Sequence, residues 1–192
     1  MNPQNQLGSQ FTESEYWQLE AETPIKHEFL RGRTVAMVQV SSVHVTIMGN
    51  VGTTLHGQLR GRPCRVAMSQ QRLKIAAADI QTYPDVVVSC PAFQTDPNHR
   101  DTLTDATVIV EVLSPSSEEF DRNAKFDVYK QLPSLRHYLL IAQTPYEVEH
   151  HFLDGKTWRS ETFTDAADIV RLVAIDCQLT LDEIYEDVEL SD

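Results

Sequence analysis

Hydrophobic side chains recur every four positions between residues 43 and 59. They are Val43, Ile47, Val51, Leu55 and Leu59. This spacing places them on one face of a helix, and Gly61 and Pro63 just beyond it are typical stop signals. The pattern therefore predicts a helix over residues 43–59, which carries His44 and His56.

Two uninterrupted apolar runs indicate strands that are buried on both faces. They are Val86–Val88 and Val108–Val110. Such runs are typical of central strands in a sheet that is covered on both sides. The segment HYLLIAQ, residues 137–143, is a third strand of this kind.

Capping signatures predict two further helices. Thr12 and Glu15 begin a helix over 13–21, and Ser116 and Glu119 begin another over 116–132. Each is followed by a proline, Pro24 and Pro133 respectively. On the second helix one apolar face is expected, made of Phe120, Ala124, Val128 and Leu132.

Alternating segments predict two hairpins, over residues 25–40 and 148–163, with turns at Arg31–Gly32 and Asp154–Gly155. Residues 64–75 read as one or two more strands, and a brief helix is expected near 181–185. The mixture predicts an α/β protein. We expect a tail over residues 1–12 and one domain over 13–192.

The composition, with 41% hydrophobic and 23% charged residues, is that of an ordinary globular chain. No stretch approaches the roughly 20 apolar residues that cross a bilayer, and the N-terminus has no export signal. We expect a cytoplasmic protein with no membrane partner. Cys64, Cys90 and Cys177 are far apart, so reduced thiols are expected rather than a disulfide framework or a zinc site.

The net charge of -12 argues against a nucleic-acid partner, but the charge is unevenly distributed. Residues 31–74 hold seven arginines and lysines and no acidic residue, whereas the remainder holds 9 basic and 28 acidic residues. Two interpretations stay open. The segment is either a surface that faces a polyanion or an exposed face balanced by the acidic C-terminal half.

Two carboxylates stand at or inside the apolar strands. Asp85 precedes the run Val86–Val88, and Glu111 follows Val108–Val110. Buried strands seldom hold charges without a partner. If the strands are neighbours, both carboxylates converge on one point, where they would suit a hard cation that prefers oxygen ligands.

Lys125 lies on the helix that follows Glu111, next to its apolar face, where its ammonium can lean over the strand end. A divalent cation would polarise a phosphate and activate water, and the ammonium would hold that water or offset negative charge. This combination is typical of phosphodiester hydrolysis. The alternative is a simple helical ion pair with Asp121.

Several segments closely resemble the Uma-type restriction endonuclease family of PD-(D/E)XK nucleases. They are IKHEFLRG, SSVHVTIMGN, YPDVVV, VIVEVLSPSS, DRNAKFDVYKQLPSLRHYLL and LTLDEIYEDVEL. The likeness runs from about residue 13 to the end. It implies a restriction-endonuclease-like fold, with a central mixed sheet flanked by helices, and a DNA substrate.

The resemblance also implies roles for residues. Asp85 and Glu111 would bind Mg²⁺ or Mn²⁺, with the carbonyl of Val112 as a further ligand, and Glu28 would add an acidic group. Lys125 would replace the usual motif lysine, because Leu113 stands at that position. Gln70 stands where similar proteins often have an acidic residue.

Two interpretations of function remain. The first is a metal-dependent endonuclease acting on DNA, for which a homodimer is plausible because duplex cutting commonly uses two sites. The second is an inactive nuclease-fold module that binds nucleic acid or a protein. Leu113, Gln70 and the net charge favour it.

Four histidines are expected to be surface residues rather than zinc ligands, because neither His44 and His56 nor His150 and His151 have zinc-ligand spacing. His44, at the start of its helix, could nevertheless approach the site or a phosphate. Glu28 has an alternative too, as an ion-pair partner of Lys26 or Arg31 across the hairpin.

Overall fold

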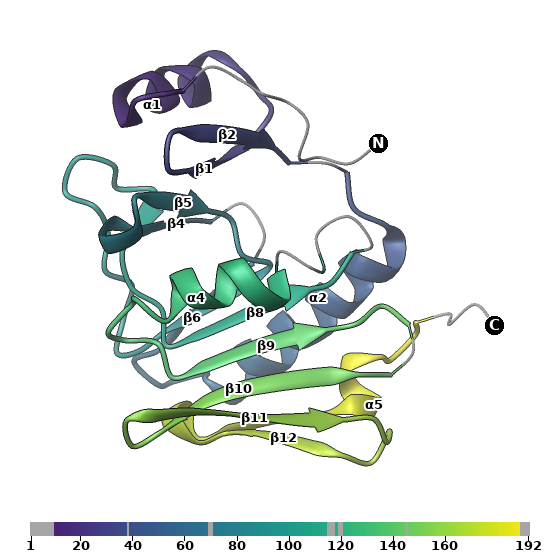
Figure 1. Cartoon of the computed structure of the whole chain (residues 1–192). Helices are drawn as coiled ribbons and strands as arrows, with labels where there is room; N and C mark the ends of the chain where they lie inside the picture. The colour runs from purple at the N-terminus through teal and green to yellow at the C-terminus, as the bar shows by residue number, and fades with distance from the viewer. Residues whose placement is uncertain are drawn as a thin grey trace.

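The apolar runs of the sequence form the centre of a six-stranded mixed sheet (Figure 1). The structure, a computed structural model, describes residues 10–37, 39–68, 71–114, 118, 121–144 and 146–188. The strands of this sheet, in spatial order, are β11 (Thr157–Phe163), β10 (Val148–Asp154), β9 (His137–Ile141), β8 (Val108–Val112), β6 (Val86–Ser89) and β3 (Arg65–Met68). Only β8 and β9 pair in parallel.

A second mixed sheet has five strands and lies toward the N-terminal helix. Its spatial order is β2 (Arg33–Ala36), β1 (His27–Leu30), β5 (Ile80–Thr82), β4 (Arg72–Ile75) and β7 (Thr102–Leu103). Helix α1 (Glu13–Glu22) begins with the predicted Thr12–Glu15 capping box. The hairpin of β1 and β2 turns at Arg31 and Gly32, both at positive φ, as the sequence indicated.

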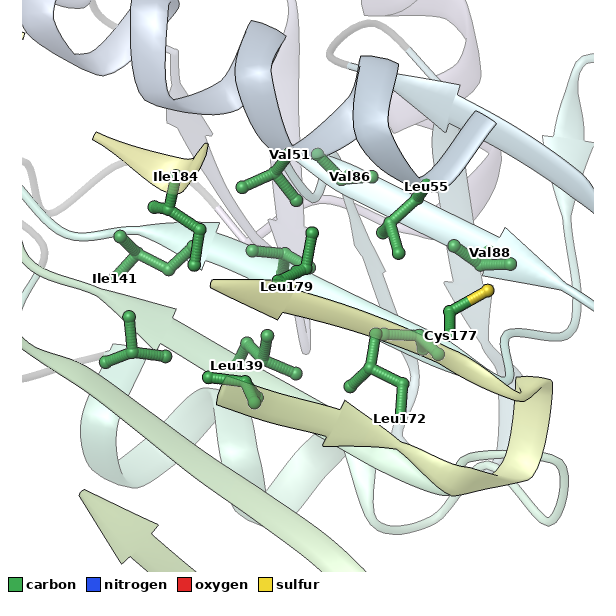
Figure 2. Packing of buried hydrophobic residues seen from close by; sticks show 14 of the residues in the cluster. Val51, Leu55, Val86, Val88, Leu139, Ile141, Leu172, Cys177, Leu179 and Ile184 are labelled. Carbon is green, nitrogen blue, oxygen red and sulfur yellow. The ribbon is translucent and has the colours of Figure 1, made fainter. Parts of the chain in front are cut away.

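The two faces of the six-stranded sheet carry two different cores, because side chains alternate along each strand. Val108 and Val110 face a core that helix α2 (Ser42–Gln58) covers, together with the hairpin β12 (Ile169–Leu172) and β13 (Cys177–Thr180) and helix α5 (Leu181–Ile184). Figure 2 shows Val51 and Leu55 of α2 pointing into this core. Ile109 faces the opposite core, which contains helix α4 (Phe126–Tyr129) and the five-stranded sheet.

The segment before α4 differs from its prediction. Asp121–Lys125 is a turn of π-helix, and α4 ends at Tyr129 rather than at residue 132. A π-helix bonds residue i to i+5, so it shifts which side chains face inward. Ala124, predicted on the apolar face, is exposed, while Asp121 is buried. The predicted Ser116–Glu119 cap lies outside the described residues.

The prediction of three reduced thiols is wrong for two of them, because Cys64 and Cys90 form a disulfide. Strands β3 and β6 pair antiparallel with Arg65 opposite Ser89, and one further step brings Cys64 opposite Cys90. Their Cα atoms lie 4.4 Å apart, within reach of a disulfide. Cys177 is free and buried, as expected for a thiol.

The prediction of surface histidines is wrong for His44, His150 and His151, which are buried, whereas His56 is exposed. His150 Nε2 lies 2.9 Å from Nδ1 of His137, its diagonal neighbour across the β9–β10 pair. Burial lowers the pKa of His137 to about 4 and that of His150 to about 3. Within the described part of the chain, no helix is long and apolar enough to span a membrane.

The buried histidine pair should make the protein sensitive to acid. Unfolded histidine takes up a proton near pH 6.5, but His137 and His150 stay neutral in the native state until about pH 4 and 3. The unfolded state then binds more protons, so the free energy of unfolding should fall as the pH drops from about 6.5 toward 4. Urea denaturation across this range measures the slope.

The variant His150→Phe should reduce this slope, while His56→Gln, at an exposed position, should leave it unchanged. Glu111, whose pKa is raised, titrates in the opposite sense, and the comparison between variants cancels its contribution. Equal slopes for His150→Phe and the unmodified protein would contradict the prediction.

Candidate active site

The register of two central strands brings Asp85 and Glu111 together. Strand β6 pairs antiparallel with β8, and Val86 lies opposite Val110. One step beyond this pair, Asp85 comes next to Glu111, close enough for its carboxylate to raise the pKa of Glu111. The expectation that the two strands are neighbours is therefore confirmed.

Both carboxylate oxygens of Asp85 accept hydrogen bonds. Oδ1 lies 2.8 Å from Nε2 of His44, on the first turn of α2. Oδ2 accepts from the backbone N–H of Val112 at 2.7 Å, at the end of β8. The side chain of Asp85 is 17% exposed, so it stands where the interior meets solvent.

Glu111 is buried among apolar residues and is held by two donors. The hydroxyl of Tyr129 donates to Oε1 at 2.7 Å, and Nζ of Lys125 lies 3.3 Å from the same oxygen. Burial raises the pKa of Glu111 to about 8. The ammonium of Lys125 opposes this rise, and the nearby carboxylates of Asp121 and Asp85 add to it.

Lys125 is the cation at the centre of the carboxylates. Its Nζ lies 3.0 Å from Asp121, 3.3 Å from Glu111 and 3.3 Å from Glu28. Burial by itself would lower the pKa of Lys125, but Glu111 and Glu28 outweigh that effect and hold it well above its usual range. The helical ion pair with Asp121 and the approach to Glu111 are thus both present.

Glu28 reaches the cluster from β1 of the other sheet. Its carboxylate accepts a hydrogen bond from the hydroxyl of Thr82 on β5 and pairs with Lys125. The hydroxyl of Thr82 lies 3.3 Å from that of Tyr129, which also contacts Glu111. Side chains from both sheets therefore meet at one cluster.

The chemistry of this donor set fits a hard divalent cation. Glu28, Glu111 and Asp121 surround the ammonium of Lys125, and Asp85 lies close to Glu111, so acidic groups outnumber cations in the cluster. Among the described residues no three His, Cys, Asp or Glu side chains form a ready-made cage. Mg²⁺ commonly binds through one or two carboxylates and keeps several waters, so two converging carboxylates suffice.

The two residues after Glu111 have distinct positions. Val112 contacts Asp85 through its N–H, and the role of its carbonyl as a ligand stays a prediction. Leu113, at the usual lysine position, is buried in the core that contains α4. Gln70, where an acidic residue was expected, lies outside the described residues.

The basic segment 31–74 is not a continuous band of free charge. Arg72 pairs with Glu20 at 2.7 Å, and Lys74 pairs with Glu13 at 2.5 Å. These two residues tie α1 to β4, so they hold the N-terminal elements together. Exposed basic residues remain at Arg31, Arg33, Arg60 and Arg65.

The mixed sheets, the flanking helices and the carboxylate cluster define a restriction-endonuclease-like α/β protein. The same fold occurs in the crystal structure of a "putative nuclease belonging to DUF820" from Anabaena variabilis ATCC 29413. The TM-score is 0.71 at 15% sequence identity, and the match covers 86% of this chain and 94% of that one. At this identity the likeness establishes the fold alone.

Residues 13–182 match the model of the Uma2 family, whose description is "Putative restriction endonuclease", so the chain belongs to this family. Two relatives come from Synechocystis sp. (strain ATCC 27184 / PCC 6803 / Kazusa). The uncharacterized protein slr1290 is 34% identical over 175 residues, 89% of each chain. The uncharacterized protein sll1609 is 35% identical over 140 residues, 73% of this chain and 79% of its own.

Sequence reasoning did not place Asp121, Tyr129 or Thr82 at the site. Asp121, Lys125 and Tyr129 stand four residues apart, a spacing that signals a shared helical face. This spacing could have indicated all three residues, whereas the sequence prediction gives Asp121 only an ion pair with Lys125. No sequence pattern indicates Thr82, because its contact with Glu28 joins two strands that are separated by 54 residues in the chain.

Removing the ammonium should expose how strongly the carboxylates depend on it. Lys125→Met leaves Glu28, Glu111 and Asp121 without their shared cation, and breaking such a buried pair costs about 3 kcal/mol or more. We expect a loss of this size in the free energy of unfolding at pH 7, measured with urea.

Lys156→Met, at an exposed position on the β10–β11 turn, is the matched control and should change the unfolding free energy by less than about 0.5 kcal/mol. A Lys125→Met protein as stable as this control would show that the carboxylates do not need the ammonium.

Proposed function

We propose that this protein is a divalent-metal-dependent endonuclease that hydrolyses phosphodiester bonds of DNA. Asp85 and Glu111 would bind Mg²⁺ or Mn²⁺, with the carbonyl of Val112 as a further ligand. The observation that carries the proposal is the convergence of Asp85, Glu111 and Lys125 in a cluster where acidic groups outnumber cations. Membership of the Uma2 family, whose description is "Putative restriction endonuclease", supports it.

Each side chain has a definite task in this proposal. When bound, the cation would polarise the scissile phosphate and lower the pKa of the attacking water. Lys125, with its pKa held high, stays protonated and can hold that water or offset charge that develops on the phosphate. Glu28, through its contacts with Lys125 and Thr82, keeps the ammonium in place beside Glu111.

Leu113 supports a second candidate, an inactive nuclease-fold module that binds nucleic acid or a protein. The usual lysine position is buried and apolar, so catalysis depends on Lys125 acting from the helix. A divalent-ion titration separates the candidates. Metal binding that depends on Asp85, without cleavage of any nucleic acid, would favour the module.

Plasmid nicking with Mg²⁺ and Mn²⁺ tests the proposal. We expect Asp85→Asn, Glu111→Gln and Lys125→Met each to lower the nicking rate on the order of 100-fold or more, because each removes a metal ligand or the compensating charge. Glu28→Gln should cause a smaller loss, since its carboxylate acts through Lys125. The measurement is the conversion of supercoiled to open-circular plasmid. This conversion needs a cut in one strand only, so a single active site is sufficient.

Asp127→Asn is the matched control, because Asp127 is an exposed carboxylate on α4 that pairs only with the nearby Lys130 in the contacts of the described residues. It should nick at the unmodified rate. If the unmodified protein leaves supercoiled DNA intact with both metals while a known nuclease cuts it, the endonuclease proposal fails.

A further inference from the structure

The first turn of α2 places a buried histidine against Asp85. His44 is 5% exposed, and its Nε2 lies 2.8 Å from Asp85 Oδ1. An ionised carboxylate can only accept hydrogen bonds, so Nε2 of His44 donates to it. The other ring nitrogen, Nδ1, is buried without a hydrogen-bond partner among the described residues.

His44 occupies a position that packing alone would give to an apolar side chain. The buried face of α2 consists of His44, Ile47, Val51, Gly52 and Leu55. A buried polar atom without a partner costs stability, and an apolar side chain at this position would avoid that cost. Its contact with Asp85 is the feature that an apolar residue could not supply.

A second polar connection fixes the start of the same helix. Ser41, the N-cap of α2, accepts a hydrogen bond from the N–H of His44 and donates its hydroxyl to Gln143 at 2.6 Å. Gln143 in turn donates to the carbonyl of Leu113 at 2.6 Å. The first turn of α2 is thus anchored to the chain just beyond Glu111, and this anchoring holds the imidazole in place.

We propose that His44 is a positioning residue for Asp85. Between Nε2–H of His44 and N–H of Val112, the carboxylate is fixed at both oxygens, and each oxygen keeps a lone pair for a cation. Hydrogen bonds of this kind orient a carboxylate ligand and typically raise metal affinity 10- to 100-fold. The inference rests on the proposed function, because it requires that Asp85 binds a metal.

Calorimetric titration with Mn²⁺ alone, without DNA, tests this role. His44→Leu should weaken Mn²⁺ binding about 10- to 100-fold, while its urea midpoint changes little, because the unpaired nitrogen and the hydrogen bond to Asp85 are lost together. In the Asp85→Asn background, His44→Leu should cause no further loss, since the imidazole acts through that carboxylate. At saturating Mn²⁺ the nicking rate should recover to near the unmodified value.

Two amide variants distinguish positioning from a general structural role. The amide nitrogen of His44→Gln reaches about as far as Nε2, whereas that of His44→Asn reaches only as far as Nδ1. We expect His44→Gln to keep most of the Mn²⁺ affinity of the unmodified protein. His44→Asn should bind Mn²⁺ about as weakly as His44→Leu, although both amide side chains are polar and uncharged. His56→Leu, at an exposed position on the same helix, should bind Mn²⁺ as the unmodified protein does.

The outcomes separate this inference from the proposed function. If the unmodified protein binds Mn²⁺ through Asp85 but His44→Leu binds it equally well, the positioning role is wrong and the metal site stands. Equal affinities for the Gln and Asn variants would also overturn it. If the unmodified protein binds no Mn²⁺, the proposed function fails and the inference fails with it.

Discussion

The burial of Glu111 is the constraint on which the cluster depends. A carboxylate at the end of a Val-Ile-Val strand has lost its water and must be stabilised by other groups. The hydroxyl of Tyr129 and the ammonium of Lys125 provide this, and both project from the segment after β8. The π-helical turn that contains Lys125 therefore helps to stabilise an acidic group in the core, and π-turns are frequent at functional sites.

The pairing register of strands β6 and β8 connects the fold to the site. The pairing of β6 with β8 sets Asp85 next to Glu111 at the end where both strands leave the core. Alternation then sends Glu111 toward α4, and Asp85 is held by α2 on the other side. A slip of one residue would bury a different pair of side chains. The two cores, one on each face, stabilise this register and with it the geometry of the cluster.

Local patterns in the sequence were sufficient for most elements. The cap at Thr12, the spacing of apolar residues in α2 and the Asp-Gly dipeptide of the β10–β11 hairpin are signals within a few residues. The hairpin turn itself lies one residue later than predicted, at Gly155 and Lys156. Contacts between distant segments had no such signal. The disulfide of Cys64 with Cys90 depends on the pairing of β3 with β6, which residues 64–90 do not reveal by themselves. The exposure of Ala124 depends on a π-turn that a regular helical period does not describe.

The candidate site likewise contains residues that local patterns indicate and residues that only contacts between distant segments bring in. Apolar runs, a helix and a family resemblance singled out Asp85, Glu111 and Lys125. Asp85 and Glu111 lie at the ends of apolar runs, and Lys125 lies within a helix predicted from its cap and its apolar spacing. His44 and Tyr129 contact these residues only once α2 and α4 have packed on opposite faces of one sheet. The groups that would bind a metal can thus be read from short segments. The groups that orient them arise from packing. For this reason the unpaired Nδ1 of His44 is informative, because the fold tolerates a buried polar atom beside a carboxylate that is partly open to solvent.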